Sequence, residues 1–193
     1  MKRVCVFCGS NPGNDPAYEA ATAALGRLIA GRGLGLVYGG SNVGLMGTLA
    51  DAALAGGGEV IGVIPRSLVD REVAHRGLTD LRVVDTMHQR KALMADLADG
   101  FIATPGGYGT LDELCEILTW AQLGIHTKSL GLLNVLGYWD PFLAFLDHAV
   151  AAGFLKRAHR GLVQVHTESA PLLDILTDPP LSGPPESKWL EIR

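Results

Sequence analysis

The chain has little of what marks a secreted, membrane-bound or nucleic-acid-binding protein. Its three cysteines among 193 residues are too few, and odd in number, for a disulfide framework. Its apolar runs are too short to span a bilayer, and no cleavable leader pattern follows Met1. A net charge of −4 provides no broad positive surface for nucleic acid or an anionic membrane. We therefore expect a cytoplasmic protein without nucleic-acid or membrane partners, which must capture any anion locally.

The cysteines and histidines predict neither a redox centre nor a metal site. Cys5 and Cys8 have the spacing of redox pairs, but both fall in an expected strand, where an odd separation directs their side chains to opposite faces. The six histidines form no pair with cysteine or carboxylate partners at helical or finger-like spacing. We expect structural thiols, no metal and no cofactor.

What the sequence does contain is a regular alternation of β-branched apolar runs with segments of helical period. The expected strands are 3–8, 34–38, 60–64, 81–84, 100–104, 130–134 and 162–165. The expected helices are 16–32, 44–55, 87–98, 110–123, 139–152 and 170–176. This alternation is typical of stacked βαβ units. We predict an α/β fold, Rossmann-like and doubly wound, whose mainly parallel sheet has helices on both faces.

Length and composition indicate one domain. A chain of 193 residues with 48% apolar and 19% charged residues can bury a large core. We assign residues 1–177 to a single Rossmann-like domain. Residues 178–193 contain four prolines and predict an extended, flexible C-terminal tail.

Glycine-rich loops follow three of the expected strands, at residues 9–13, 39–47 and 105–113. Ligands of such folds bind at the carboxyl ends of the strands, so the three loops should converge on one crevice. None matches a dinucleotide fingerprint or a P-loop. Glycines also serve tight turns alone, so each loop by itself has a plain structural explanation.

The loop at 105–113, Pro-Gly-Gly-Tyr-Gly-Thr-Leu-Asp-Glu, has the chemistry of an anion site. An apolar strand runs into a glycine turn that opens a helix, whose free N–H groups and positive dipole end favour a phosphate. Glu113 would then lie about one turn from that phosphate. Thr110 and Glu113 also fit a capping box, in which both side chains satisfy backbone donors at a helix start. The spacing leaves both interpretations open.

The helix expected from Met87 has a second unusual feature. At about 100° per residue, Arg90 falls inside the apolar arc of this helix, and Lys91 lies at its edge with its amine expected in water. An inward guanidinium is costly to desolvate unless an anion pairs with it. That anion is either a structural salt-bridge partner or, in a functional site, an anionic substrate or the Glu113 carboxylate.

Together, the Met-His-Gln-Arg-Lys-Ala-Leu-Met run at 87–94 and the loop at 105–113 resemble the paired motifs of the LOG (Lonely Guy) family. The likeness covers nearly the whole chain. Members of this family are cytokinin riboside 5'-monophosphate phosphoribohydrolases. The resemblance therefore implies hydrolysis of the N-glycosidic bond of a nucleoside 5'-monophosphate to free base and ribose 5-phosphate, with AMP as an accepted substrate. It also implies a homodimer whose active site lies near the interface.

The resemblance also implies which residues act. Arg90 and Glu113 correspond to the essential pair of the family, in which Glu113 would stabilise a cation-like sugar and orient or deprotonate water. The residues implied to contact the substrate are Ser10, Gly40, Glu72, Met87, Arg90, Lys91, Gly106, Gly107, Tyr108, Gly109, Thr110, Glu113 and Thr119.

Two positions depart from the family pattern. Ser41 stands where many members have a third consecutive glycine, and Asp112 stands where plant members typically have glutamate. We expect Ser41 to narrow the backbone approach in the second loop or to shift a position of positive φ.

Two other functions stay open. A lysine decarboxylase would hold pyridoxal phosphate on a lysine, and Lys91 alone of the five lysines lies within a motif. A non-catalytic nucleotide or cofactor carrier would bind phosphate without reacting.

Overall fold

The computed structural model describes residues 1–69 and 73–178. Glu72 and the tail from residue 179 onward lie outside this part of the chain. The strands are β1 (Arg3–Phe7), β2 (Gly35–Tyr38), β3 (Val60–Pro65), β4 (Asp80–Val84), β5 (Gly100–Ala103), β6 (Ser129–Leu133) and β7 (Val163–His166). The helices are α1 (Pro16–Gly31), α2 (Gly44–Ala55), α3 (Arg66–Val69), α4 (Met87–Leu97), α5 (Tyr108–Gln122), the 3₁₀ turn η1 (Val135–Gly137), α6 (Asp140–Ala151), α7 (Arg157–Arg160) and α8 (Ser169–Thr177).

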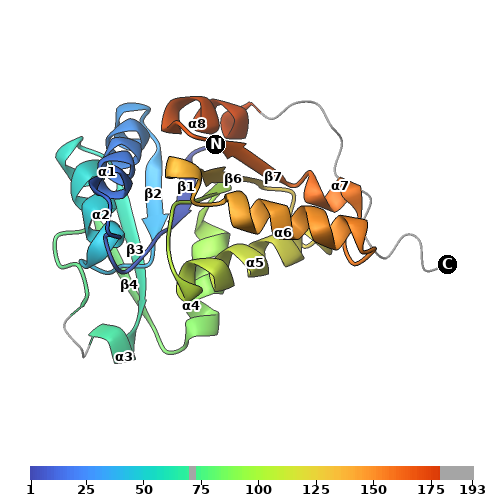
Figure 1. The fold of residues 1–193 in the computed structure, drawn as a ribbon. Coiled ribbons are helices and arrows are strands. Elements are labelled where there is room, and N and C mark those ends of the chain that lie inside the picture. The colour runs from blue at the N-terminus through green and yellow to red at the C-terminus, as the bar shows by residue number, and fades with distance from the viewer. Residues whose placement is uncertain (70–72, 179–193) are drawn as a thin grey trace.

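Within the described residues, seven strands form one parallel sheet in the order β4-β3-β2-β1-β5-β6-β7 (Figure 1). The chain builds outward from β1 to β4 and then restarts at β5 on the other side of β1. The predicted doubly wound α/β fold is confirmed. Because the strand order reverses between β1 and β5, the loops that follow these strands flank the switch point at which such folds bind ligands.

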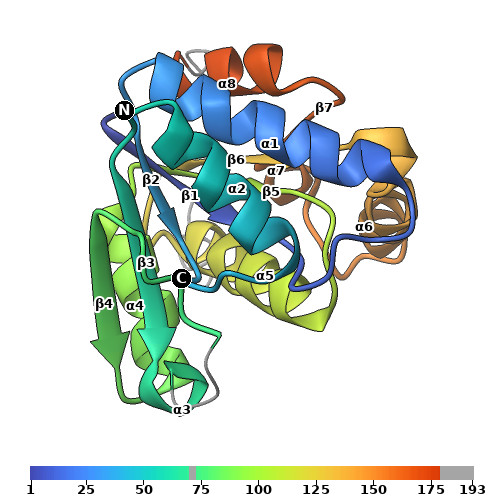
Figure 2. The same ribbon diagram turned by 90° about the vertical axis from the view of Figure 1, so that its left-hand side faces the viewer.

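Helices cover both faces of the sheet (Figures 1 and 2). One face packs against α1, α2 and α8, and its core includes Cys8 and Leu25. The other face packs against α4, α5 and α6, and its core includes Cys5 and Met94. The two thiols therefore face opposite layers, as predicted. Burial raises the pKa of both, so neither is prepared for redox chemistry.

The sequence prediction missed α3, η1 and α7, because elements of three or four residues are too short to show a helical period. The other boundaries agree to within one residue except the start of α5, which begins two residues before the predicted position. In the described part of the chain, no helix has both the length and the apolar character needed to cross a membrane.

Candidate active site

The loops that follow β1, β2 and β5 meet at the carboxyl edge of the sheet, as predicted. The Gly9 N–H donates to the Pro105 carbonyl at 3.1 Å and joins the loops on the two sides of the switch point. A Cβ on Gly44 would overlap the Ser10 carbonyl, so the second loop packs directly on the first. Ser10 is exposed and Gly40 is buried, and both lie in these converging loops.

Ser41 is accommodated in the second loop without strain. The left-handed backbone falls on Gly40, with φ of 75°, so the serine needs no positive φ and the expected shift does not occur. The Ser41 hydroxyl donates to the Val73 carbonyl at 2.9 Å, and Ser41 also forms an antiparallel bridge with Ala74. These contacts tie the second loop to the segment that precedes β4.

The third loop leaves backbone amides free at the start of α5. Gly107 is the N-cap of this helix, and among the described residues no side chain caps its first turn. Its first N–H groups are therefore available to an anion. A Cβ on Gly106 would overlap the Thr110 hydroxyl and lie 2.9 Å from the Gly9 nitrogen, so this position requires glycine. This is the arrangement expected of a phosphate-binding loop.

The interpretation of Thr110 and Glu113 as a capping box is wrong. Thr110 is buried in the first turn of α5 instead of preceding it, and Glu113 pairs with Arg90. A capping box is present instead on α4, where the Thr86 hydroxyl accepts from the Gln89 N–H and the Gln89 side chain accepts from the Thr86 N–H. The Thr-x-x-Gln spacing in the sequence was the signal for it.

Arg90 and Glu113 form a buried ion pair between α4 and α5. Arg90 Nη1 lies 3.1 Å from Glu113 Oε1, and the two side chains are only 9% and 8% exposed. Arg90 also donates from Nε to the Val63 carbonyl at 3.0 Å and from Nη2 to the Gly39 carbonyl at 3.3 Å. A Cβ on Gly39 would overlap Nη2, so the glycine makes room for the guanidinium. Of the partners considered for the inward-facing Arg90, the structure provides Glu113.

Burial raises the pKa of the Glu113 carboxyl, and the Arg90 guanidinium opposes that rise. A carboxyl group whose protonation is shifted toward neutral pH and which is held beside a cation is suited to general acid and base chemistry. Because the pair is desolvated, its effect on any charge that develops nearby is only weakly screened.

Lys91 differs from the expectation that its amine reaches water. The amine lies 3.0 Å from Asp112 Oδ2 and 3.1 Å from Glu116 Oε2, and the side chain is 9% exposed. Burial alone would lower the pKa of this amine, but hydrogen bonds to the two carboxylates outweigh the burial and raise it. An amine held protonated in this way is a poor nucleophile for a Schiff base. Asp112 supplies one of the two carboxylates.

Three other predicted contacts lie at the rim of this site. Met87 begins α4 and is 43% exposed, and Tyr108 begins α5 and is 94% exposed. Gly109 follows Tyr108 and is also exposed. Each is therefore accessible to a ligand. Within the described residues, no group of three or more potential ligand side chains is arranged to hold a metal ion.

Thr119 is the predicted contact that the fold does not bring to the pair. It lies six residues beyond Glu113 on α5, about 9 Å along the helix axis and about 120° around it. Thr119 is exposed, and its hydroxyl donates to the Cys115 carbonyl at 2.7 Å. Within one chain, Thr119 and Glu113 therefore face different surroundings.

Tyr138 lies at the site but was missed from the sequence. Its hydroxyl donates to the Gly106 carbonyl at 2.5 Å, although the two residues are 32 positions apart. No motif marks this tyrosine, and only the order of the strands brings it to the third loop.

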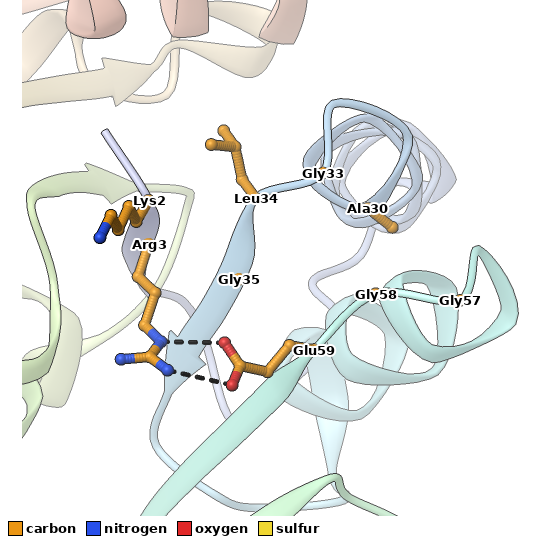
Figure 3. A pocket seen from close by; sticks show the side chains of 9 residues that line it. All are labelled: Lys2, Arg3, Ala30, Gly33, Leu34, Gly35, Gly57, Gly58 and Glu59. Atoms are coloured by element: carbon orange, nitrogen blue, oxygen red, sulfur yellow. Dashed lines mark hydrogen bonds and ion pairs between the residues drawn. The ribbon is translucent and has the colours of Figure 1, made fainter.

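A separate hollow of about 450 Å³ lies at the opposite edge of the sheet, beside the amino ends of β1, β2 and β3 (Figure 3). Arg3 and Glu59 cross it with a two-point ion pair, at 2.9 and 3.0 Å. Because ligands in this fold class bind at the carboxyl edge, the hollow is not the candidate site.

Known proteins are similar to this chain over most of its length. A family model described as "Possible lysine decarboxylase" matches residues 46–176. Cytokinin riboside 5'-monophosphate phosphoribohydrolase LOG of rice (Oryza sativa subsp. japonica) is 53% identical over 163 residues, which cover 84% of this chain and 67% of the rice protein. LOG1 of Arabidopsis thaliana, with the same enzyme name, is 49% identical over 178 residues, covering 92% of this chain and 84% of LOG1. The chain belongs to the LOG family.

Solved structures show how widely the fold of this LOG-family chain is shared. The molybdenum cofactor carrier protein of Chlamydomonas reinhardtii matches it with a TM-score of 0.70 at 20% identity, covering 92% of this chain and 96% of the carrier. DNA processing protein A of Helicobacter pylori matches with a TM-score of 0.59 at 18% identity, covering 91% and 80%. At these identities, the likeness shows the fold alone.

Proposed function

We propose that this protein hydrolyses the N-glycosidic bond of cytokinin nucleoside 5'-monophosphates and releases the free base and ribose 5-phosphate. The observation that carries the proposal is the buried Arg90–Glu113 pair, which lies in the same site as an uncapped helix start. Rice and Arabidopsis relatives that are 53% and 49% identical are named as enzymes of this activity.

The start of α5 is suited to the phosphate of the substrate. Amides from Gly106 to Thr110 would anchor it, because they combine free N–H groups with the positive end of the helix dipole. An ester held there places its ribose toward the Arg90–Glu113 pair. The rim residues Met87 and Tyr108 would then contact the nucleotide from above.

The Arg90–Glu113 ion pair is suited to cleavage of the N-glycosidic bond. Cleavage of a ribosyl C–N bond passes through a cation-like sugar, which a nearby carboxylate stabilises. Glu113 would supply that carboxylate and would orient or deprotonate the attacking water. Arg90 favours the ionised form of Glu113 and so opposes the effect of burial. Glu72, which lies outside the described residues, would bind the ribose hydroxyls or assist the carboxylate chemistry.

The amides at the start of α5 and the Arg90–Glu113 pair act on parts of the substrate that all nucleoside 5'-monophosphates share. Phosphate and ribose are common to cytokinin nucleotides and AMP, and the catalytic pair meets only these parts. We therefore include AMP among the substrates, with the base setting the relative rates.

Base release from AMP and from isopentenyladenosine monophosphate tests this function. Glu113→Gln keeps the size of the side chain but removes its charge, so we expect kcat to fall by about 10²-fold or more. Glu168→Gln, at an exposed residue before α8, is the matched control and should retain wild-type turnover. Near-normal turnover of a folded Glu113→Gln protein would refute the role of this carboxylate. Tight binding of AMP with no base release from any nucleotide would favour a carrier.

We also propose that the protein acts as a homodimer. Every residue of α6 is at least partly exposed, including Phe145 at 63%, and Phe154 just beyond this helix is 90% exposed. Apolar side chains in such positions are typical of a surface that a partner covers. Thr119, which faces away from Glu113 of its own chain, would be supplied to the site of the second copy.

The remaining assignments rest on composition. We propose residues 1–177 as one nucleotide-binding domain in a cytoplasmic protein that requires no cofactor. The tail predicted at 178–193 lies, from residue 179 onward, outside the described residues. The net charge of −4 is consistent with a protein that has no nucleic-acid or membrane partner.

A further inference from the structure

The loop between β6 and α6 reaches the loop that follows β5. These two strands are parallel neighbours in the sheet, so their loops leave the same edge of the sheet. Tyr138 joins them, because its hydroxyl donates to the Gly106 carbonyl at 2.5 Å. One hydrogen bond therefore links a residue with no part in the sequence motifs to the centre of the phosphate-binding loop.

The hydrogen bond from Tyr138 fixes the orientation of the whole Gly106–Gly107 peptide unit, not only that of the Gly106 carbonyl. The peptide unit is planar and, within the described residues, trans, so a carbonyl and the N–H that follows it point in opposite directions. With the Gly106 carbonyl directed to Tyr138, the Gly107 N–H must point to the other side of the peptide. Gly107 is the N-cap of α5, so this N–H belongs to the amides that face an anion.

The turn that positions Tyr138 has a strained backbone. Leu136 has φ of 52° and ψ of 27°, and Gly137 has φ of 72°, so two consecutive residues are left-handed. This backbone is costly for leucine, and Leu136 is 64% exposed, so little packing offsets the cost. The Asn134 side chain holds the turn by accepting from the Trp139 N–H at 2.7 Å. Strain that is maintained by such contacts is typical of a functional position.

The ring of Tyr138 is held on two sides. It meets the Tyr18 ring edge-on at 5.9 Å between centroids and the Trp139 ring at 5.2 Å and 90°. Tyr18 lies in the first turns of α1, beside the first glycine loop, where a Cβ on Gly13 would lie 2.7 Å from its ring. These contacts limit the rotation of the tyrosine and keep its hydroxyl at the Gly106 carbonyl.

We propose that Tyr138 is a positioning residue of the phosphate site. Its hydroxyl orients the Gly106–Gly107 peptide so that the Gly107 N–H faces the phosphate of the nucleotide. This inference rests on the proposed function, and it predicts an effect confined to phosphate recognition.

Tyr138→Phe tests the inference, since it removes the hydroxyl and keeps the ring and its aromatic contacts. We expect the KM for AMP to rise about fivefold while kcat stays within about twofold, as for the loss of one ground-state hydrogen bond. The dissociation constant for inorganic phosphate, measured by calorimetric titration, should rise by a similar factor. Inhibition by adenosine, which has no phosphate, should not change. Tyr18→Phe, in the same aromatic cluster, is the control and should leave the KM unaltered.

An unchanged KM and unchanged phosphate binding in Tyr138→Phe would overturn the inference. An equal weakening of phosphate and adenosine binding would also overturn it, because a general distortion of the site would not distinguish the two ligands. If the wild-type protein released no base from any nucleotide, the proposed function would fail, while the phosphate titration would still decide the role of Tyr138.

Discussion

At the scale of single residues, the chemistry depends on how one carboxylate is held. Glu113 has been removed from water, which favours its protonated form, and Arg90 at 3.1 Å favours its ionised form. Removal of either partner would leave the other charge buried and unpaired, which costs about 3–5 kcal/mol. The same ion pair therefore contributes both to the stability of the site and to its reactivity.

The pH dependence of kcat/KM for AMP should report the Glu113 carboxyl. Since burial raises its pKa, the proton is held more tightly than by an exposed glutamate, and the inactive protonated form appears at higher pH. As the pH falls, we expect activity to be lost above the pH range in which ordinary glutamates protonate. The residual activity of Glu113→Gln should lack this acid limb. Persistence of the limb in that variant would assign it to another group.

At the scale of elements, the start of α4 decides where Arg90 lies. Thr86 and Gln89 cap each other's backbone N–H groups, and Arg90 follows directly within the first turns. A helix of 11 residues depends on such contacts, because short helices are marginal without them. The capping box thus keeps the guanidinium in register with the Val63 and Gly39 carbonyls that accept from it.

Thr86→Ala should lower the free energy of unfolding by about 1 kcal/mol, because it removes the oxygen that accepts from the Gln89 N–H. Urea unfolding followed by circular dichroism measures this loss. Thr127→Ala, at an exposed residue between α5 and β6, is the matched control and should change stability by less than about 0.5 kcal/mol. Equal effects of the two substitutions would contradict the importance of the cap.

At the scale of the whole molecule, the helices on the two faces of the sheet are buried to different extents. α1 buries residues along its length against the sheet and α2, whereas every residue of α6 keeps some exposure. We expect α6 to pack against a second copy, because it is incompletely covered within one chain, carries the exposed Phe145 side chain and is followed by the exposed Phe154.

Phe145→Asp should therefore dissociate the dimer, since it places a charge in an apolar interface. Sedimentation analysis should give twice the 20.4 kDa chain mass for the wild type and the mass of one chain for the variant. Base release should fall with dissociation, because Thr119 of the second copy is lost from the site. Ala20→Asp, at an exposed residue of α1 on the other face, should leave both mass and activity unchanged. A wild-type monomer with full activity would refute the dimer.

The sequence by itself determined the features that follow from local periodicity and short motifs. The alternation of apolar runs predicted the parallel sheet, the helical period placed Arg90 on an inward face, and the glycine run at 105–109 predicted an anion site. Only the tertiary structure decided the partners of these groups, such as Glu113 for Arg90 and the Gly106 carbonyl for Tyr138. Such contacts join residues far apart in the chain, and they depend on strand order and on how loops pack, which no local pattern specifies.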